Sequence, residues 1–223
     1  LTNSKILNHQ MIFKYKVFRC FVSVNELIFT LSALILQLFI IFGCSDIQTN
    51  KYSTNSSSLG DAALSIIDPS IIYDPDYKRI PYPNGDVEPG RGVCADVIVR
   101  AYRKMGIDLQ ERVHEDMVAN FNQYPKKWGL NRPDPNIDHR RVPNLMTFFQ
   151  RNGQSLSISR DGADYKPGDI VAWRINGGIL HIGIVVHKNA PISGTPMVVH
   201  NIGGGQVMED RLFSWQIIGH YRY

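Results

Sequence analysis

The sequence contains few cysteines, no long hydrophobic run and no excess of either charge. Only three of its 223 residues are cysteine, which excludes a small domain built on disulfides. Its longest charge-free apolar stretch, 27–42, is marginal for crossing a bilayer core about 30 Å thick, which takes roughly 20 residues. Four of the 24 basic and one of the 20 acidic residues lie in 1–43, so the remainder is nearly neutral. We therefore predict no nucleic-acid partner, because such partners require clustered basic residues.

The first 43 residues predict an export signal. Basic residues precede the apolar stretch 27–42, and Gly43 and Cys44 follow it, which is the pattern of a secretory signal. The end of the stretch resembles a bacterial lipobox, and this resemblance implies that Cys44 is lipidated after cleavage. An uncleaved N-terminal membrane anchor is the alternative. In both cases we expect a cell-envelope protein facing the periplasm or the cell exterior, at the outer membrane if the cell is Gram-negative.

The remaining chain predicts a tether followed by one globular domain. Residues 44–60 are polar and rich in Ser and Asn, which is typical of a flexible tether. Residues 61–223 carry first helical and then strand-like periodicity, which favours an α+β fold with an antiparallel sheet. The expected helices are 62–67, 94–105, 108–122 and 144–151, and the expected strands are 169–174, 182–186, 197–201 and 217–223.

One thiol and two histidines form the candidate catalytic group. Cys94 is the free thiol that remains if the signal is removed and Cys44 is lipidated, and it begins a predicted helix, whose N-terminus can lower a thiol pKa. A thiol nucleophile needs a base, and the base needs a group that orients it. His181 begins one predicted strand and is the candidate base, while His200 ends the next strand and is the orienting residue. Asn201 is the alternative to His200.

Other histidines offer weaker alternatives. His187 lies on the same strand face as His181, but it lies at the end of the strand, where we expect solvent. His114 with Asp116, and Asp138 with His139, have spacings found in metal sites, but no third cluster accompanies them. We therefore predict neither a metal nor any other cofactor.

The motifs around these residues resemble those of NlpC-type cell-wall peptidases. The run 94–107 resembles the nucleophile helix of that family, and the runs 166–171, 181–185 and 198–200 resemble three of its strands. Pro81 and Tyr82 resemble the loop whose tyrosine helps to form the oxyanion hole. The run 136–145 resembles exported bacterial proteins of the domain-of-unknown-function 1287 family, and that likeness extends almost from end to end. The resemblance implies a papain-like fold, with a nucleophile helix packed on a small antiparallel sheet. We expect the protein to be a monomer.

The resemblance also implies a chemistry. A cysteine peptidase or amidase of this kind cleaves an amide bond, here in peptidoglycan stem peptides. Cys94 attacks, His181 takes the thiol proton, His200 orients His181, and the Cys94 N–H and the Tyr82 hydroxyl stabilise the oxyanion. Two alternatives stay open: a non-catalytic lipoprotein that binds the envelope, and a thioester-forming acyltransferase similar to a transglutaminase.

The chain departs from the family pattern beside the nucleophile. Val93-Cys94-Ala95-Asp96 stands where relatives usually read Asp-Cys-Ser-Gly, which puts the usual γ-glutamyl-diamino-acid substrate in question. We interpret Asp96 as a residue that recognises a substrate amine or one that complements the helix N-terminus. Arg140 and Arg141 are either solvated or bind a substrate carboxylate through their planar guanidinium groups.

Overall fold

The computed structural model describes residues 56–129 and 131–223. The predicted signal, the predicted lipidation site Cys44 and residues 44–55 of the predicted tether lie outside this part of the chain. Within the described residues, no helix combines the length and the apolar character that a membrane span requires.

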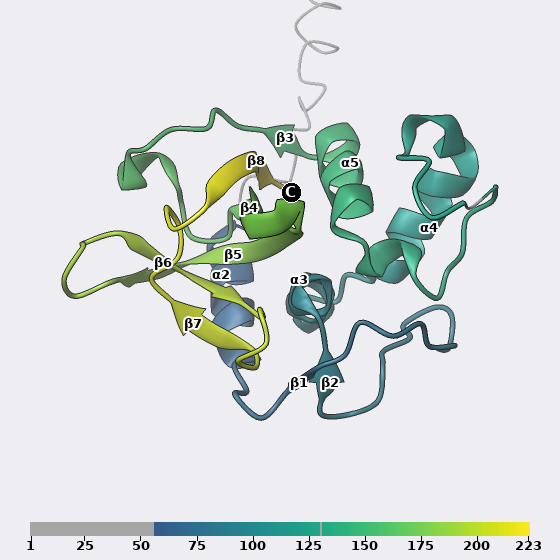
Figure 1. Ribbon diagram of the computed structural model, residues 1–223, viewed down its shortest axis with the longest axis horizontal. Coiled ribbons are helices and arrows are strands. Elements are labelled where there is room, and N and C mark those ends of the chain that lie inside the picture. The colour runs from purple at the N-terminus through teal and green to yellow at the C-terminus, as the bar shows by residue number, and fades with distance from the viewer. Residues whose placement is uncertain (1–55, 130) are drawn as a thin grey trace, which may run out of the picture. The chain divides into compact units, whose positions relative to one another are not determined.

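A six-stranded antiparallel sheet forms one layer of the fold, with strand order β3-β8-β4-β5-β6-β7 (Figure 1). A separate parallel pair, β1 with β2, precedes it in the chain. The bounds are β1 Ile72–Tyr73, β2 Arg91–Gly92, β3 Gln154–Ser155, β4 Ile170–Arg174, β5 Leu180–Asn189, β6 Pro196–His200, β7 Val207–Glu209 and β8 Gln216–Arg222. The central strands β4 and β5 carry Ile and Val on both faces, and both faces are buried, as expected for strands covered on two sides.

In the part of the chain that the structure describes, four helices accompany the sheet, and three of them, α2, α3 and α5, pack against it. Figure 1 shows α4 outermost. Apolar residues at helical spacing in α3, such as Val97, Ile98 and Ala101, are fully buried against the sheet. The bounds are α2 Ser56–Ser65, α3 Cys94–Lys104, α4 Leu109–Asn120 and α5 Val142–Asn152, with short 3₁₀ turns η1 Phe121–Gln123, η2 Asp138–Arg140, η3 Gly162–Asp164 and η4 Asn176–Gly178.

The predicted α+β class, with a helix packed on a small antiparallel sheet, is confirmed by these elements. A helix that begins with Cys94 packs on an antiparallel sheet, and the adjacent strands β5 and β6 carry His181 and His200. The predicted tether is too long, because α2 begins at Ser56 and includes residues 56–60. Leu59 is fully buried and packs with Ala62 and Ala63 one helical turn away, so this segment belongs to the core.

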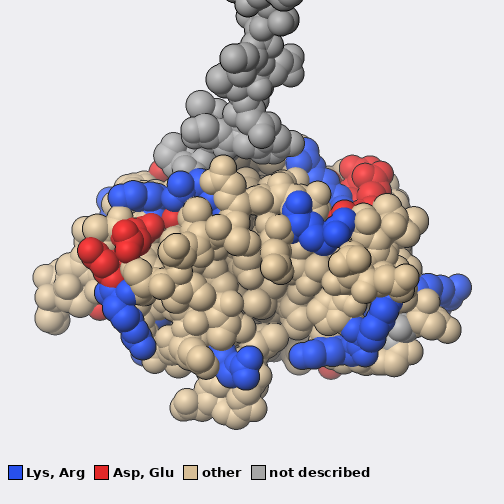
Figure 2. All heavy atoms as spheres, turned by 90° about the horizontal axis from the view of Figure 1, so that it is seen from above, with Lys and Arg blue, Asp and Glu red and all other residues tan. Residues whose placement is uncertain are grey.

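Charged side chains are spread over the surface. On the face seen in Figure 2, Lys and Arg side chains lie apart from one another, with uncharged surface between them and acidic groups beside some of them. This distribution follows from the nearly balanced composition of the described chain.

Candidate active site

Two short strands lead into α3, the helix that begins at the candidate nucleophile. β1 pairs with β2 in parallel, with Tyr73 opposite Gly92, and α3 begins at Cys94, two residues after that pair. Asp96 fixes this start, because its carboxylate accepts the backbone N–H of Val93 at 2.7 Å. The N–H of Cys94 lies in the first turn and has no intrahelical acceptor.

The Cys94 thiol is almost entirely buried but is surrounded by hydrogen-bond donors. The backbone N–H groups of Ile182 and Ala95 and the hydroxyl of Tyr73 lie near the sulfur, and each lowers the thiol pKa. Burial nevertheless dominates and raises the pKa of the Cys94 thiol to about 11. The prediction of a lowered thiol pKa is therefore wrong, because desolvation outweighs the helix N-terminus. The resting thiol is protonated at neutral pH.

His181 and His200 form a buried pair that ends at a carboxylate. Nε2 of His181 lies 2.8 Å from Nδ1 of His200, and Nε2 of His200 lies 3.0 Å from a carboxylate oxygen of Glu209 on β7. The second contact has ion-pair distance but falls short of regular hydrogen-bond geometry. A carboxylate accepts protons in hydrogen bonds, so it favours a proton on Nε2 of His200. Nδ1 of His200 then accepts from Nε2 of His181, and Nδ1 of His181 keeps its lone pair.

Both imidazoles are neutral at rest. Burial, followed by the neighbouring His200, lowers the pKa of His181 to about 3. Burial also lowers the pKa of His200, although Glu209 opposes this shift. The ring of His181 stacks on Trp173 at 5.7 Å and contacts Trp215 edge-on at the same centroid distance, which fixes its orientation.

The strand β5 brings the candidate base to the thiol. The backbone N–H of Ile182, the residue after His181, lies near the Cys94 sulfur and lowers the thiol pKa. Within the described residues no hydrogen bond joins Cys94 to His181, and Nδ1 of His181 has no other hydrogen-bond partner. Catalytic hydrogen bonds of this kind are often long without substrate and tighten when substrate binds.

Tyr82 does not lie at the thiol, where it was predicted to stabilise the oxyanion, and Asn201 does not contact His181, which it was considered to orient. Tyr82 is 43% exposed, and its ring contacts His114 on α4 rather than the thiol. Tyr73 lies nearer to the thiol instead: it lines the same cavity as Cys94, and the two side chains shift each other's pKa. Asn201 is buried, and its side chain binds the Gly203 N–H and the Gly92 carbonyl, which holds the turn after β6. His200 is thus the partner of His181.

Asp96 and Arg140 bind each other. The guanidinium of Arg140 donates from Nε and from a terminal nitrogen to the Asp96 carboxylate at 2.9 and 3.0 Å, and both side chains are buried. Its terminal nitrogens also bind the backbone carbonyls of Asp74 and Asp76. The predicted roles of Asp96 and Arg140 in substrate binding are therefore not supported, because their polar groups already have partners.

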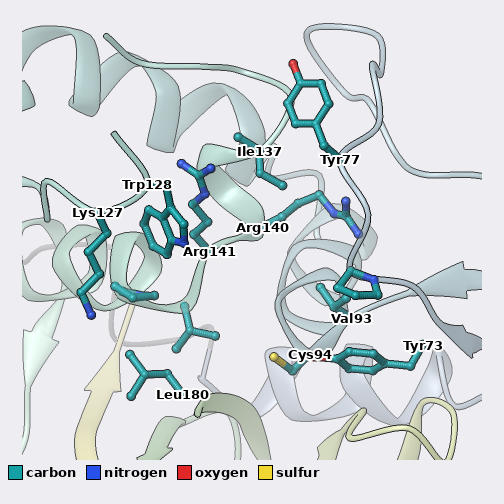
Figure 3. Close-up of a pocket in the computed structure, with 13 residues that line it drawn as sticks. Tyr73, Tyr77, Val93, Cys94, Lys127, Trp128, Ile137, Arg140, Arg141 and Leu180 are labelled. Atoms are coloured by element: carbon teal, nitrogen blue, oxygen red, sulfur yellow. The ribbon is translucent and has the colours of Figure 1, made fainter. Parts of the chain in front are cut away.

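A cavity of about 540 Å³ opens beside the thiol. Figure 3 shows the Cys94 sulfur facing this space, with Tyr73 on one side and Leu180 below. Arg141 and Trp128 line the part of the cavity remote from Tyr73. No group of three or more His, Cys, Asp or Glu side chains within the described residues is arranged to hold a metal ion.

The comparisons of the sequence with known proteins point to one family. Residues 60–223 match the model of the DUF1287 family, whose description is "domain of unknown function". The uncharacterized protein YijF of Escherichia coli (strain K12) is 52% identical over 166 residues, which is 74% of this chain and 80% of that protein.

Two solved structures are also similar, at low sequence identity. NlpC1 from Trichomonas vaginalis is 15% identical with a TM-score of 0.41, and NlpC2 from the same organism is 13% identical with a TM-score of 0.41. Each match covers 77% of this chain, which spans only 45% and 48% of the two solved chains.

Proposed function

The chain belongs to the DUF1287 family, and from the geometry of its site we propose that it is a cysteine hydrolase that cleaves an amide bond in peptidoglycan stem peptides. The observation that carries this proposal is the arrangement around one cavity. A thiol at a helix N-terminus faces the cavity, and the strand that touches the thiol carries His181 in a buried relay to His200 and Glu209.

The resting protonation states require proton transfer to accompany the attack. The thiol and the imidazole are both neutral, so Nδ1 of His181 accepts the thiol proton as the sulfur attacks the carbonyl carbon. The resulting imidazolium is stabilised through His200 by the negative charge of Glu209, 3.0 Å from the far ring nitrogen. His181 then gives the proton to the leaving amine as the C–N bond breaks, and a thioester remains on Cys94.

Water completes the cycle. His181 removes a proton from a water molecule that attacks the thioester carbon, the C–S bond breaks, and the thiolate recovers that proton. The carboxylic acid product leaves. During both steps the oxyanion accepts hydrogen bonds from the Cys94 N–H and from the Tyr73 hydroxyl. Burial raises the pKa of Tyr73 well above its usual value, so this hydroxyl keeps its proton and remains a donor.

The direct test replaces the nucleophile. Cys94→Ala should abolish the release of soluble fragments from purified sacculi, measured by chromatography and mass spectrometry, while the unfolding midpoint stays near that of the unaltered protein. Undiminished release by a folded Cys94→Ala variant would eliminate the mechanism.

The two alternative functions give different products from the same experiment. A transferase joins an added primary amine to the acyl fragment, whereas a hydrolase releases the free acid whether or not the amine is present. A non-catalytic binder releases nothing and forms no thioester on Cys94 that mass spectrometry detects. Either of these results would contradict hydrolysis.

A matched pair of tyrosine variants tests the oxyanion assignment. Tyr73→Phe removes the hydroxyl that contacts Cys94 and should lower kcat by about 10²-fold or more, the usual effect of losing one oxyanion donor. Tyr82→Phe removes a hydroxyl outside the cavity and should leave kcat unchanged. Equal rates for the two variants would show that Tyr73 does not stabilise the oxyanion.

We also place the enzyme in the cell envelope, held through a lipid on Cys44. Only the sequence pattern of residues 27–44 supports this placement. Metabolic labelling with a radioactive fatty acid tests it: the label should enter the unaltered protein and be absent from Cys44→Ala.

A further inference from the structure

The cavity beside Cys94 has a positively charged lining. Its lining residues include Lys127, Arg140 and Arg141 but no Asp or Glu. Arg140 is already neutralised by Asp96 in a buried bidentate pair. Arg141 and Lys127 therefore provide the positive charge that faces the cavity.

Arg141 lacks the partners that a guanidinium normally has. Its closest carboxylate oxygen, on Asp138, is 3.9 Å away, which is too far for a hydrogen bond. Within the described residues the Arg141 guanidinium donates no hydrogen bond, although its side chain is only 16% exposed. Burial lowers the pKa of Arg141, which shows the cost of holding this cation away from water. An anionic ligand in the cavity would offset that cost.

Trp128 holds Arg141 in a geometry that suits a carboxylate. The guanidinium carbon lies 4.2 Å from the centre of the Trp128 ring. Stacking on an aromatic face leaves the edge of the guanidinium and its N–H groups available for a bidentate acceptor. Figure 3 shows Arg141 alongside Trp128, with Lys127 beyond the ring.

The backbone at Trp128 is also unusual. Its φ is 64°, a left-handed conformation that is rare for a bulky side chain. Such strained positions cluster at ligand-binding sites, where the surrounding structure maintains them. Here the strained residue carries the ring that stacks on Arg141.

We propose that Arg141, Trp128 and Lys127 form a subsite that binds a free carboxylate of the peptide substrate while its scissile amide lies at Cys94. This subsite rests on the proposed function and specifies its substrate class as peptides with an ionised carboxyl group near the cleaved bond. Arg141 binds the carboxylate through two N–H groups, and Lys127 adds a second positive charge at the cavity wall. A peptide in which that carboxylate is a carboxamide would lose the charge-assisted hydrogen bonds.

Binding to an inert enzyme tests the subsite separately from catalysis. The full chain with Cys94→Ala is titrated by calorimetry with a synthetic stem peptide in two forms, one with free carboxyl groups and one with carboxamides. The free acid should bind at least about tenfold more tightly, as expected when a charged hydrogen-bonded pair is lost. Adding Arg141→Gln should remove this preference, and Lys127→Gln, at an exposed position, should reduce it.

Arg132→Gln is the matched control. Arg132 is exposed, lies nine residues from Arg141 in the chain and does not line the cavity, so its loss removes one positive charge without touching the subsite. The preference for the free acid should survive this change. Equal affinities for the two peptides, absence of binding by both, or a preference that persists in folded Arg141→Gln would overturn the subsite. Failure of Cys94→Ala to stop fragment release would instead overturn the hydrolase, since the titration does not depend on turnover.

Discussion

Two buried histidines on the same sheet differ in what their second ring nitrogen contacts. His220 on β8 uses both nitrogens: one lies 2.9 Å from the Asp169 carboxylate and the other 3.0 Å from the Ser157 carbonyl. His181 on β5 uses one nitrogen for His200, and the other has no hydrogen-bond partner within the described residues. A buried polar group with every partner in place holds structure, whereas an incompletely paired one beside a cavity is available for chemistry.

Each histidine belongs to a cluster, His220 with Asp169 and Arg222 and His181 with His200 and Glu209, and the two clusters also differ in how their charges are balanced. Arg222 donates two hydrogen bonds to Asp169, at 2.8 and 3.0 Å, so that carboxylate is neutralised where it is buried. Burial raises the Asp169 pKa, but the hydrogen bonds from His220 and Arg222 outweigh it and hold the pKa below its ordinary value. In the His181 cluster both imidazoles are neutral at rest, Arg211 pairs with Glu209 at 3.5 Å, and the histidines gain a positive charge only when His181 takes a proton. We therefore expect mutations in the first cluster to change stability and mutations in the second to change rate.

Removing the base should have the largest effect on activity. His181→Gln should lower kcat by about 10³-fold, within the range that general acid–base groups contribute. His187→Gln is the control, because His187 lies at the exposed end of the same strand and pairs with Asp61 at 3.1 Å. Fragment release from sacculi by both variants measures the difference. If the two variants lose activity equally, His181 is not the base.

Disrupting the structural cluster should give the largest loss of stability. Asp169→Asn leaves Arg222 and His220 without their carboxylate and should lower the free energy of unfolding by about 3 kcal/mol. Its kcat per folded molecule should stay unchanged. Urea denaturation measures the first quantity, and Asp164→Asn, at an exposed carboxylate, should stay within about 0.5 kcal/mol of the unaltered protein. A rate loss in Asp169→Asn without a stability loss would reverse the roles of the two clusters.

The elements and the principal site residues could be predicted because their signals are local. Cys94 begins a helix with clear 3.6-residue periodicity, and His181 and His200 lie on strands with alternating Val and Ile. Tyr73 and Glu209 could not be found in this way. Tyr73 reaches the thiol only through the β1–β2 pairing, and Glu209 reaches His200 only because β7 adds to β6. Neither short strand has enough residues to show periodicity.

The failed electrostatic predictions have a related cause. The Cys94 pKa depends on how completely the fold excludes water from the thiol, whereas its place in the sequence shows only the helix N-terminus. Asp96 and Arg140 are 44 residues apart, and their buried pairing depends on where η2 packs against α3. Local sequence shows that a charged residue is present but not which opposite charge it meets.

The carboxylate at the end of the relay should have a smaller effect than the base. Glu209→Gln removes the negative charge 3.0 Å from Nε2 of His200 and should lower kcat by about tenfold, equivalent to about 1.4 kcal/mol of electrostatic stabilisation of the imidazolium. KM and the unfolding midpoint should not change, because Glu209 positions a proton and does not touch substrate. Asp210→Asn, which removes the adjacent exposed carboxylate, is the control. An unchanged kcat in Glu209→Gln would show that Glu209 does not stabilise the protonated His181–His200 pair.

The two clusters should also differ in the pH dependence of stability. His181 has a folded pKa of about 3, below its ordinary value of about 6.5 in an unfolded chain. Between these two pH values His181 is protonated in the unfolded chain but not in the folded protein. The contribution of His181 to the free energy of unfolding is therefore complete above about pH 6.5. Below that pH it decreases by at most about 1.4 kcal/mol for each unit by which the pH is lowered. The lowered pKa of Asp169 acts in the same direction, but its contribution is lost only below about pH 4.

Urea denaturation at pH 5, 6 and 7 separates the two clusters. His181→Gln should flatten the slope of stability against pH over this range, whereas Asp169→Asn should lower stability by the same amount at each pH. Burial also lowers the pKa values of His139 and His200, so part of the slope should remain in every variant. A slope in His181→Gln equal to that of the unaltered protein would mean that His181 already carries its proton in the folded state. The neutral base required by the proposed mechanism would then be absent.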